Sequence, residues 1–157
     1  MIYPTRMHSA LLISSMLCLA SCSSTESMIK ESRRLSAQGD SQASLQYLQK
    51  SLQEKPNAID LKVAYQTELS QYINTQLLQG DLARAQSDPE RALLFYQQAM
   101  AWDGRNQRAE QGILLANRQI KQRAQFAKAE AAKNNGDVES ALKWLDQILA
   151  ETPNHKA

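Results

Sequence analysis

Few side chains in this sequence are of types that carry out catalysis. There are two cysteines, Cys18 and Cys22, and two histidines, His8 and His155, which leave the interior of the chain without an imidazole base. Acidic pairs occur at predicted helix starts, where capping and the helix dipole account for them. No glycine-rich phosphate loop and no metal-ligand spacing is present. We therefore expect no enzymatic activity, no metal site and no cofactor.

Cys22 follows a segment with the features of a secretion signal. A single fixed charge, Arg6, precedes an apolar run over residues 10–20 that is too short to span a bilayer as a mature helix. Leu19-Ala20-Ser21 then leads directly into Cys22. We predict a signal peptide over residues 1–21. The pattern at residues 19–22 resembles the lipobox of bacterial lipoprotein precursors, which implies lipidation of Cys22. The alternative is an ordinary secretory signal with an incidental cysteine.

Residues 1–22 resemble the lipobox region of bacterial lipoprotein precursors, which implies that a diacylglycerol is attached to Cys22. The short polar segment 22–27 is then predicted to be a tether between the lipid and a folded domain. Ser23 follows the cysteine, whereas Asp at this place is linked to retention at the inner membrane in Gram-negative lipoproteins. The resemblance therefore implies a lipid anchor in the outer membrane, with the protein facing the periplasm.

The charge of the predicted mature chain does not favour nucleic acid as a partner. After Cys22 there are 17 Lys and Arg against 16 Asp and Glu, a net charge of +1. A nucleic-acid-binding protein is expected to carry a basic face or stripe. Cys18 lies in the segment to be removed and Cys22 would be acylated, so no disulfide is expected.

From Met28 onward the composition is typical of helices, and the helix breakers recur at regular distances. Gly39-Asp40, Ser87-Asp88 and Gly136-Asp137 are 48 and 49 positions apart. Gly ends helices in the left-handed conformation and Asp caps the next one. A second class of break follows each of these at Pro56-Asn57, Asp103-Gly104 and Pro153-Asn154.

These breaks define an internal repeat of helix-turn-helix units over about 28–58, 59–106 and 107–157, within a helical domain 28–157. The second helix of each unit has a small residue and, four positions later, a larger one: Ser44 and Leu48, Ala92 and Tyr96, Ala141 and Leu145. This order lets two helices pack closely. We expect the small residues to be buried, with a generic helical bundle as the alternative.

The repeat resembles the tetratricopeptide repeat (TPR) family. The third unit matches its signature with Gly136, Asp137, Ala141, Leu145 and Pro153, and the first with Gly39, Asp40, Ser44, Leu48, Ser51 and Pro56. The predicted fold is all-α, a TPR-like superhelix. The usual period is 34 residues, and the 14 to 15 additional residues fall in the first helices of the second and third units. These helices are predicted to be elongated, over about 58–86 and 107–134.

Each elongated helix has a predicted apolar stripe that is expected to form core. The stripe of the first consists of Leu61, Tyr65, Leu69, Ile73 and Leu77. The stripe of the second consists of Ala109, Ile113, Ala116, Ile120, Ala124, Ala127 and Ala131. The many alanines predict a close approach to a neighbouring helix.

In the repeat family a concave groove lined by the first helices binds partners. The matching positions supply five candidate partner-binding residues: Arg33, Leu77, Arg84, Phe126 and Lys133. An apolar floor with a mixed-charge rim would suit an amphipathic helix or a folded partner. The alternative is that Leu77 and Phe126 are buried between the long helices.

The last predicted helix has two further candidate residues. Leu142 and Leu149 are one heptad apart and so share a helix face. In a continuing array a further first helix would cover this face. We expect it to bind a partner or to mediate self-association.

Taken together, these features predict a lipid-anchored TPR-like scaffold that binds envelope proteins and supports secretion or pilus machinery. The alternative is the N-terminal region of a secretin-like lipoprotein, an outer-membrane channel subunit of type II secretion or type IV pilus systems. The layout of lipobox, Ser-rich tether and repeats resembles that family. Its channel-forming β region is absent from this sequence, so the gene downstream of Ala157 would separate the two.

Overall fold

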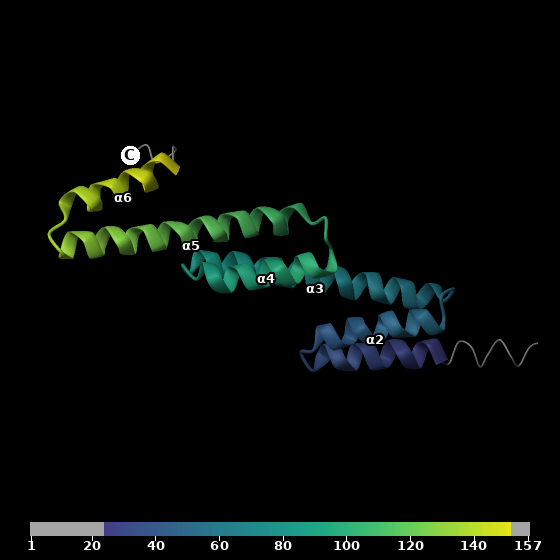
Figure 1. The fold of residues 1–157 in the computed structure, drawn as a ribbon. Coiled ribbons are helices and arrows are strands. Elements are labelled where there is room, and N and C mark those ends of the chain that lie inside the picture. The colour runs from purple at the N-terminus through teal and green to yellow at the C-terminus, as the bar shows by residue number, and fades with distance from the viewer. Residues whose placement is uncertain (1–23, 152–157) are drawn as a thin grey trace, which may run out of the picture. The chain divides into compact units, whose positions relative to one another are not determined.

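The computed structural model describes residues 24–151, and all regular structure in this range is helical (Figure 1). The first helix covers residues 24–37. It is followed by α2 (Ser41–Glu54), α3 (Ile59–Ala85), α4 (Pro89–Trp102), α5 (Gln107–Asn134) and α6 (Val138–Glu151). The predicted all-α helical-repeat class is confirmed.

The elongated first helices are also confirmed. The α3 and α5 helices contain 27 and 28 residues, whereas α2, α4 and α6 contain 14 each. The α5 helix has the predicted bounds, because Asn106 caps it through a hydrogen bond from the Ala109 amide to the Asn106 side chain, 3.0 Å long.

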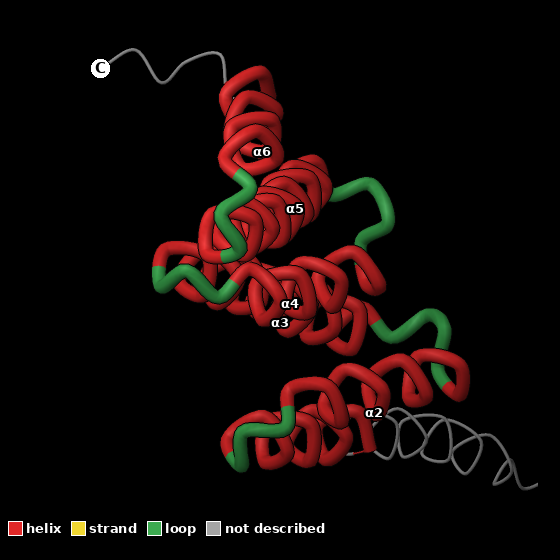
Figure 2. The backbone as a smooth tube through the Cα atoms, turned by 60° about the vertical axis from the view of Figure 1, so that its left-hand side comes forward, coloured by secondary structure: helices red, strands yellow, loops and turns green. Residues whose placement is uncertain are grey.

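Three turns repeat the same hydrogen-bond pattern along the chain (green in Figure 2). Gly39, Ser87 and Gly136 have positive φ angles of 87°, 61° and 77°. The amide of the following aspartate donates to the carbonyl five residues earlier, at 3.2, 2.9 and 3.0 Å. Each aspartate then accepts from the amide three residues later, at 2.9, 3.1 and 3.0 Å. The internal repeat is therefore present at the level of individual hydrogen bonds.

Ser87 is the one described residue other than glycine with a positive φ angle. The left-handed conformation is unfavourable for a residue with a Cβ atom, at roughly 1–2 kcal/mol. We therefore expect Ser87→Gly to raise the free energy of unfolding by about 1 kcal/mol. Urea denaturation followed by circular dichroism measures this change, and Ser41→Gly at the start of α2 serves as the control. An unchanged midpoint for Ser87→Gly would contradict the strain argument.

The predicted tether over residues 22–27 is wrong for its described part, because residues 24–27 belong to the first helix. The hydroxyl of Ser27 donates to the Ser24 carbonyl at 2.9 Å, and the ammonium of Lys55 donates to the Ser24 hydroxyl. Serine and threonine are favourable near helix starts, where their short polar side chains bond the backbone. The helix therefore includes polar residues that lack hydrophobic periodicity.

The chain divides into two compact units, one up to Tyr72 and the other from Ile73. The core of the first unit contains Leu45, Leu48 and Leu61, which are fully buried. Ser32 and Ser44 share a buried hydrogen bond of 2.9 Å between their hydroxyls. Polar atoms that pair in this way can be buried without a desolvation penalty.

The core of the second unit forms where α4 packs against α5 and α5 packs against α6. Ala92, Tyr96 and Ala99 of α4 are fully buried. Ala92 and Ala141 are both buried, as Ser44 is in the first unit, so the predicted small positions are confirmed. Leu145 is only half-buried.

Three residues of the stripe predicted along α3 are buried, and the other two, Tyr65 and Leu69, are half-buried. The stripe predicted along α5 is right only in its first half. Ala109 and Ala116 are buried, but Ala124, Ala127 and Ala131 are exposed. Gln125 and Ala129 are buried instead. The physical reason is that α5 packs against two different helices, α4 and α6, so the buried face turns around the helix axis.

Candidate interaction surfaces

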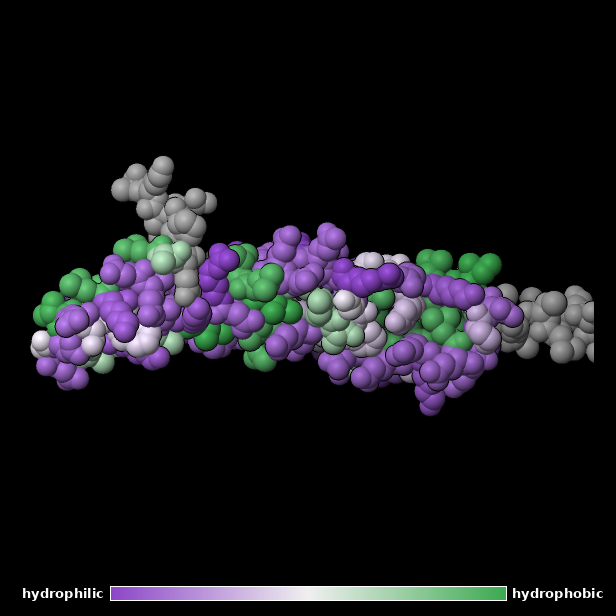
Figure 3. All heavy atoms as spheres, turned by 45° about the horizontal axis from the view of Figure 1, so that its top comes forward, coloured by the Kyte–Doolittle hydropathy of each residue, from purple (hydrophilic) through white to green (hydrophobic). Residues whose placement is uncertain are grey.

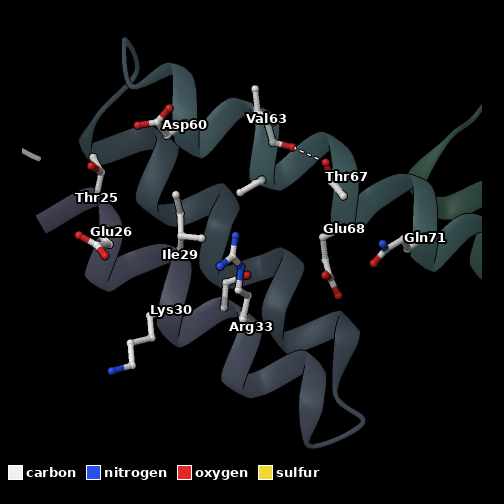
Figure 4. Close-up of a pocket in the computed structure, with 12 residues that line it drawn as sticks. Thr25, Glu26, Ile29, Lys30, Arg33, Asp60, Val63, Thr67, Glu68 and Gln71 are labelled. Atoms are coloured by element: carbon white, nitrogen blue, oxygen red, sulfur yellow. Dashed lines mark hydrogen bonds between the residues drawn. The ribbon is translucent and has the colours of Figure 1, made fainter. Parts of the chain in front are cut away.

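The first unit contains an open groove of about 800 Å³ between the first helix and the first half of α3 (Figure 4). Its apolar part consists of Ile29, Val63 and Ala64. Figure 4 shows Ile29 and Arg33 pointing from the first helix into the space toward α3. The groove therefore offers apolar surface and a positive charge to the same ligand.

The two helices that form the groove are joined by a hydrogen bond. The hydroxyl of Ser36 donates to a carboxylate oxygen of Glu68 at 2.7 Å. A charge-assisted bond of this kind is stronger than one between neutral groups. It holds the end of the first helix against α3 and so keeps the groove in a defined shape.

Four charged side chains of the groove have no hydrogen-bond or ion-pair partner within residues 24–151. They are Glu26, Lys30, Arg33 and Asp60. Two of them are acidic and two are basic, and all four are exposed. Such charges are available to orient a partner of complementary charge.

The corresponding place in the second unit is filled by a pair of opposite charge. By the repeat offset of 48, Asp81 corresponds to Arg33, and Arg108 corresponds to Asp60. Arg108 forms an ion pair with Asp81 at 2.5 Å, and the Tyr96 hydroxyl donates to the same carboxylate at 2.6 Å. The same two positions therefore hold unpaired charges in the first unit and a side-chain network in the second.

The Tyr96 ring is held between two helices by two glycines. A Cβ atom built on Gly80 of α3 would lie 2.6 Å from the ring, and one built on Gly112 of α5 would lie 2.5 Å from it. The positions that correspond to Gly80, Gly112 and Tyr96 in the first unit are Ser32, Ala64 and Leu48. A larger central side chain is thus accommodated by two smaller neighbours.

The network shifts the ionisation of both Asp81 and Tyr96. Partial burial raises the pKa of the Asp81 carboxyl, but the hydrogen bonds from Tyr96 and Arg108 and the charges of Arg108 and Arg84 outweigh it and lower the pKa overall. Burial and the neighbouring carboxylate raise the pKa of the Tyr96 hydroxyl. Asp81 therefore stabilises the fold above the ordinary pKa of a carboxyl and loses this effect as the pH falls through its lowered pKa.

The structure places the five predicted groove residues in different environments. Arg33 lines the groove of the first unit, as expected. Leu77 is 3% exposed, so its prediction as part of a binding floor is wrong. It belongs to the buried stripe of α3 and lies in the core of the second unit. Arg84 is half-buried beside Asp81 and Tyr96, where its charge acts within the chain.

The other two predicted groove residues lie at the surface of the second unit. Phe126 is 52% exposed, and Lys133 is exposed. Both belong to the second half of α5, whereas Arg33 belongs to the first unit. The predicted set is therefore divided between the two units.

The last helix carries the two leucines at its surface, as predicted. Leu142 is 56% exposed and Leu149 is 61% exposed, while the adjacent Ala141 is buried. Leu142 lines a shallow groove of about 580 Å³ along α6, together with Lys143 and Asp146. Figure 3 shows green, hydrophobic side chains at the surface of the α6 end of the chain, among purple, hydrophilic ones.

Sequence reasoning missed the α3 side of the first groove. Asp60, Val63 and Glu68 lie off the predicted apolar stripe of α3 and carry no motif. The one signal in the sequence is Val63, a β-branched apolar residue on an otherwise polar face. The groove could be found only once the first helix was placed beside α3.

Cys22 and the predicted signal peptide lie outside the described residues. Within residues 24–151 there is no cluster of three or more potential metal ligands. No helix in the described part of the chain is both long and apolar enough to cross a membrane.

Comparison with known proteins found no match of any kind. No family model, no curated protein and no solved structure matches the chain. The resemblances to bacterial lipoproteins and to tetratricopeptide repeats thus rest on the sequence, and the repeat itself on the three matching turns.

Proposed function

We propose that this protein is a lipid-anchored scaffold of the bacterial cell envelope that binds another protein through its helical repeats, in support of secretion or pilus machinery. The observation that carries the proposal is the open groove of the first unit, with its apolar floor and its four unpaired charges. Helical repeats characteristically bind partners on surfaces formed by successive units.

The lining of the groove is suited to an amphipathic segment of a partner. Ile29 and Val63 offer apolar surface, and Val63 is 60% exposed. Burying a side chain of this size contributes about 1.5–3 kcal/mol. Arg33 on one helix and Asp60 on the other would select a partner that carries both an acidic and a basic residue.

The anchor is the second part of the proposal and rests on the pattern at residues 19–22. An acylated Cys22 would attach the chain to a membrane, and Ser23 supports the outer membrane by resemblance to lipoproteins. The groove begins at Thr25, close to that cysteine in the sequence. Partner binding would then occur near the membrane surface.

Crosslinking in intact envelopes tests the groove. A photo-crosslinking amino acid in place of Thr67, which lines the groove, should give a discrete adduct with one protein. Arg33→Glu should reduce this adduct at least fivefold, because it reverses the charge of the cation that points into the groove (Figure 4).

Two controls come from the same unit. Arg34→Glu changes the neighbouring arginine, which pairs with Glu31 and does not line the groove, and should leave the adduct unchanged. A probe at Lys50, an exposed residue of α2 outside the groove, should give no comparable adduct. Equal adducts from both probe sites, or an adduct insensitive to Arg33→Glu, would contradict the proposal.

A further inference from the structure

We infer that the exposed face of α6 binds an amphipathic helix of a partner protein, in the position that α5 takes on α4. The α6 face is defined here by Leu142, Leu149, Lys143 and Asp146. This inference goes beyond the proposed function, because it concerns a different surface in the second unit and specifies the structure of its ligand.

The positions that match the two leucines of the α6 face are less exposed in the other two units. Leu142 corresponds to Leu93 in α4 and to Leu45 in α2. Leu45 is fully buried and Leu93 is half-buried, whereas Leu142 is 56% exposed. The same repeat position is therefore covered twice and uncovered once.

The second leucine of the face follows the same pattern. Leu149 corresponds to Met100 in α4 and to Leu52 in α2, and both of these are half-buried. Leu149 is 61% exposed. In the described part of the chain α2 is followed by α3 and α4 by α5, whereas α6 is the last helix of residues 24–151.

The contact between α4 and α5 shows what kind of ligand fits. The two helices pack against each other and are joined by only four residues, so the first half of α5 runs antiparallel to α4 (Figures 1 and 2). The buried side of this half consists of Ala109, Gly112 and Ala116. Small residues spaced by three and four let the two backbones approach closely. A ligand of the α6 face is thus a helix with small residues at this spacing.

The charges on α6 also favour a helix like the first half of α5 as the ligand, rather than the α6 face of a second copy of the chain. Glu139 and Asp146 flank the leucines with one basic residue, Lys143, so this surface is net acidic. Residues 107–120 of α5 contain Arg108, Arg118 and a single acidic residue, and so are net basic. Two α6 faces would bring like charges together, whereas a basic helix complements them.

A peptide with the sequence of residues 107–120 is the probe. A lactam between Glu110 and a lysine introduced by Leu114→Lys would keep it helical, since both positions are exposed in α5. The full-length chain, held in lipid nanodiscs, would be titrated into the labelled peptide and binding followed by fluorescence anisotropy. We expect saturable binding that weakens at least tenfold with Leu142→Lys and Leu149→Lys together.

Matched controls distinguish binding at the α6 face from nonspecific binding to exposed apolar side chains. Leu94→Lys changes an equally exposed leucine of α4 and should leave the affinity unchanged. A peptide with Ala109→Glu and Ala116→Glu should not bind. Leu142→Ala with Leu149→Ala provides a second variant pair without added charge, and circular dichroism verifies that each variant is folded.

Three results would overturn the inference: no binding of the peptide, binding that is insensitive to both variant pairs, or sedimentation showing dimers of the parent that Leu142→Lys and Leu149→Lys dissociate. The last result would assign the face to a second copy of the chain. Crosslinking from Thr67 reports on the groove of the first unit, so failure of this inference and failure of the proposed function are distinguishable.

Discussion

Gly112→Ala should destabilise the second unit strongly, although alanine is the better helix former. Replacing glycine by alanine inside a helix normally stabilises it by about 0.8–1 kcal/mol. At Gly112 the new methyl group would lie 2.5 Å from the Tyr96 ring, which is fully buried and has Gly80 close to it as well. Overpacking costs about 1–3 kcal/mol or more, and moving the ring would also break the Tyr96–Asp81 hydrogen bond. We expect a net loss of about 2 kcal/mol in the free energy of unfolding.

Gly104→Ala is the matched control, because its nearest neighbouring atom lies 4.0 Å from the added Cβ and its φ angle is not positive. It should leave stability unchanged or raise it slightly. Urea denaturation followed by circular dichroism measures both variants. Equal midpoints for Gly112→Ala and Gly104→Ala would show that the ring contact is not tight.

A rescue experiment tests the size compensation between the units. In the first unit Leu48 takes the place of Tyr96 and Ala64 takes that of Gly112. Gly112→Ala should therefore cost much less in a Tyr96→Leu background than in the parent. A double-mutant cycle measures this coupling. If the two substitutions changed the free energy of unfolding additively, the side-chain sizes at positions 96 and 112 would not be coupled.

Cys22→Ser should abolish lipid labelling and release the protein from membranes. The effect of the substitution on lipid labelling should be all-or-none, because no other cysteine remains after removal of residues 1–21. Stable attachment takes two or more acyl chains. Metabolic labelling with a radioactive fatty acid and fractionation in high salt are the measurements.

An uncleaved signal peptide could also hold the Cys22→Ser variant at the membrane. A second variant, in which a conventional cleavable signal precedes residue 24, removes this ambiguity. It should appear in the soluble periplasmic fraction. Membrane association of this second variant in high salt would contradict the lipid anchor.

Much of the local structure was predictable from the sequence, for a physical reason. Glycine or serine followed by aspartate ends one helix and caps the next through bonds that span only a few residues, as at Gly39, Ser87 and Gly136. The helix bounds, the elongated first helices and the buried small residues Ala92 and Ala141 follow from these local signals and from the repeat.

Only the tertiary structure decided which face of each long helix is buried. Leu77 and Phe126 hold matching repeat positions, yet Leu77 is buried and Phe126 is half exposed. The difference depends on which helices lie beside α3 and α5, and no interaction within a few residues determines that. The same holds for the matching positions Arg33 and Asp81. Arg33 lines an open groove, whereas Asp81 forms an ion pair with Arg108. The sequence alone therefore determined where helices begin and end, whereas long-range packing determined which side chains remain available to a partner.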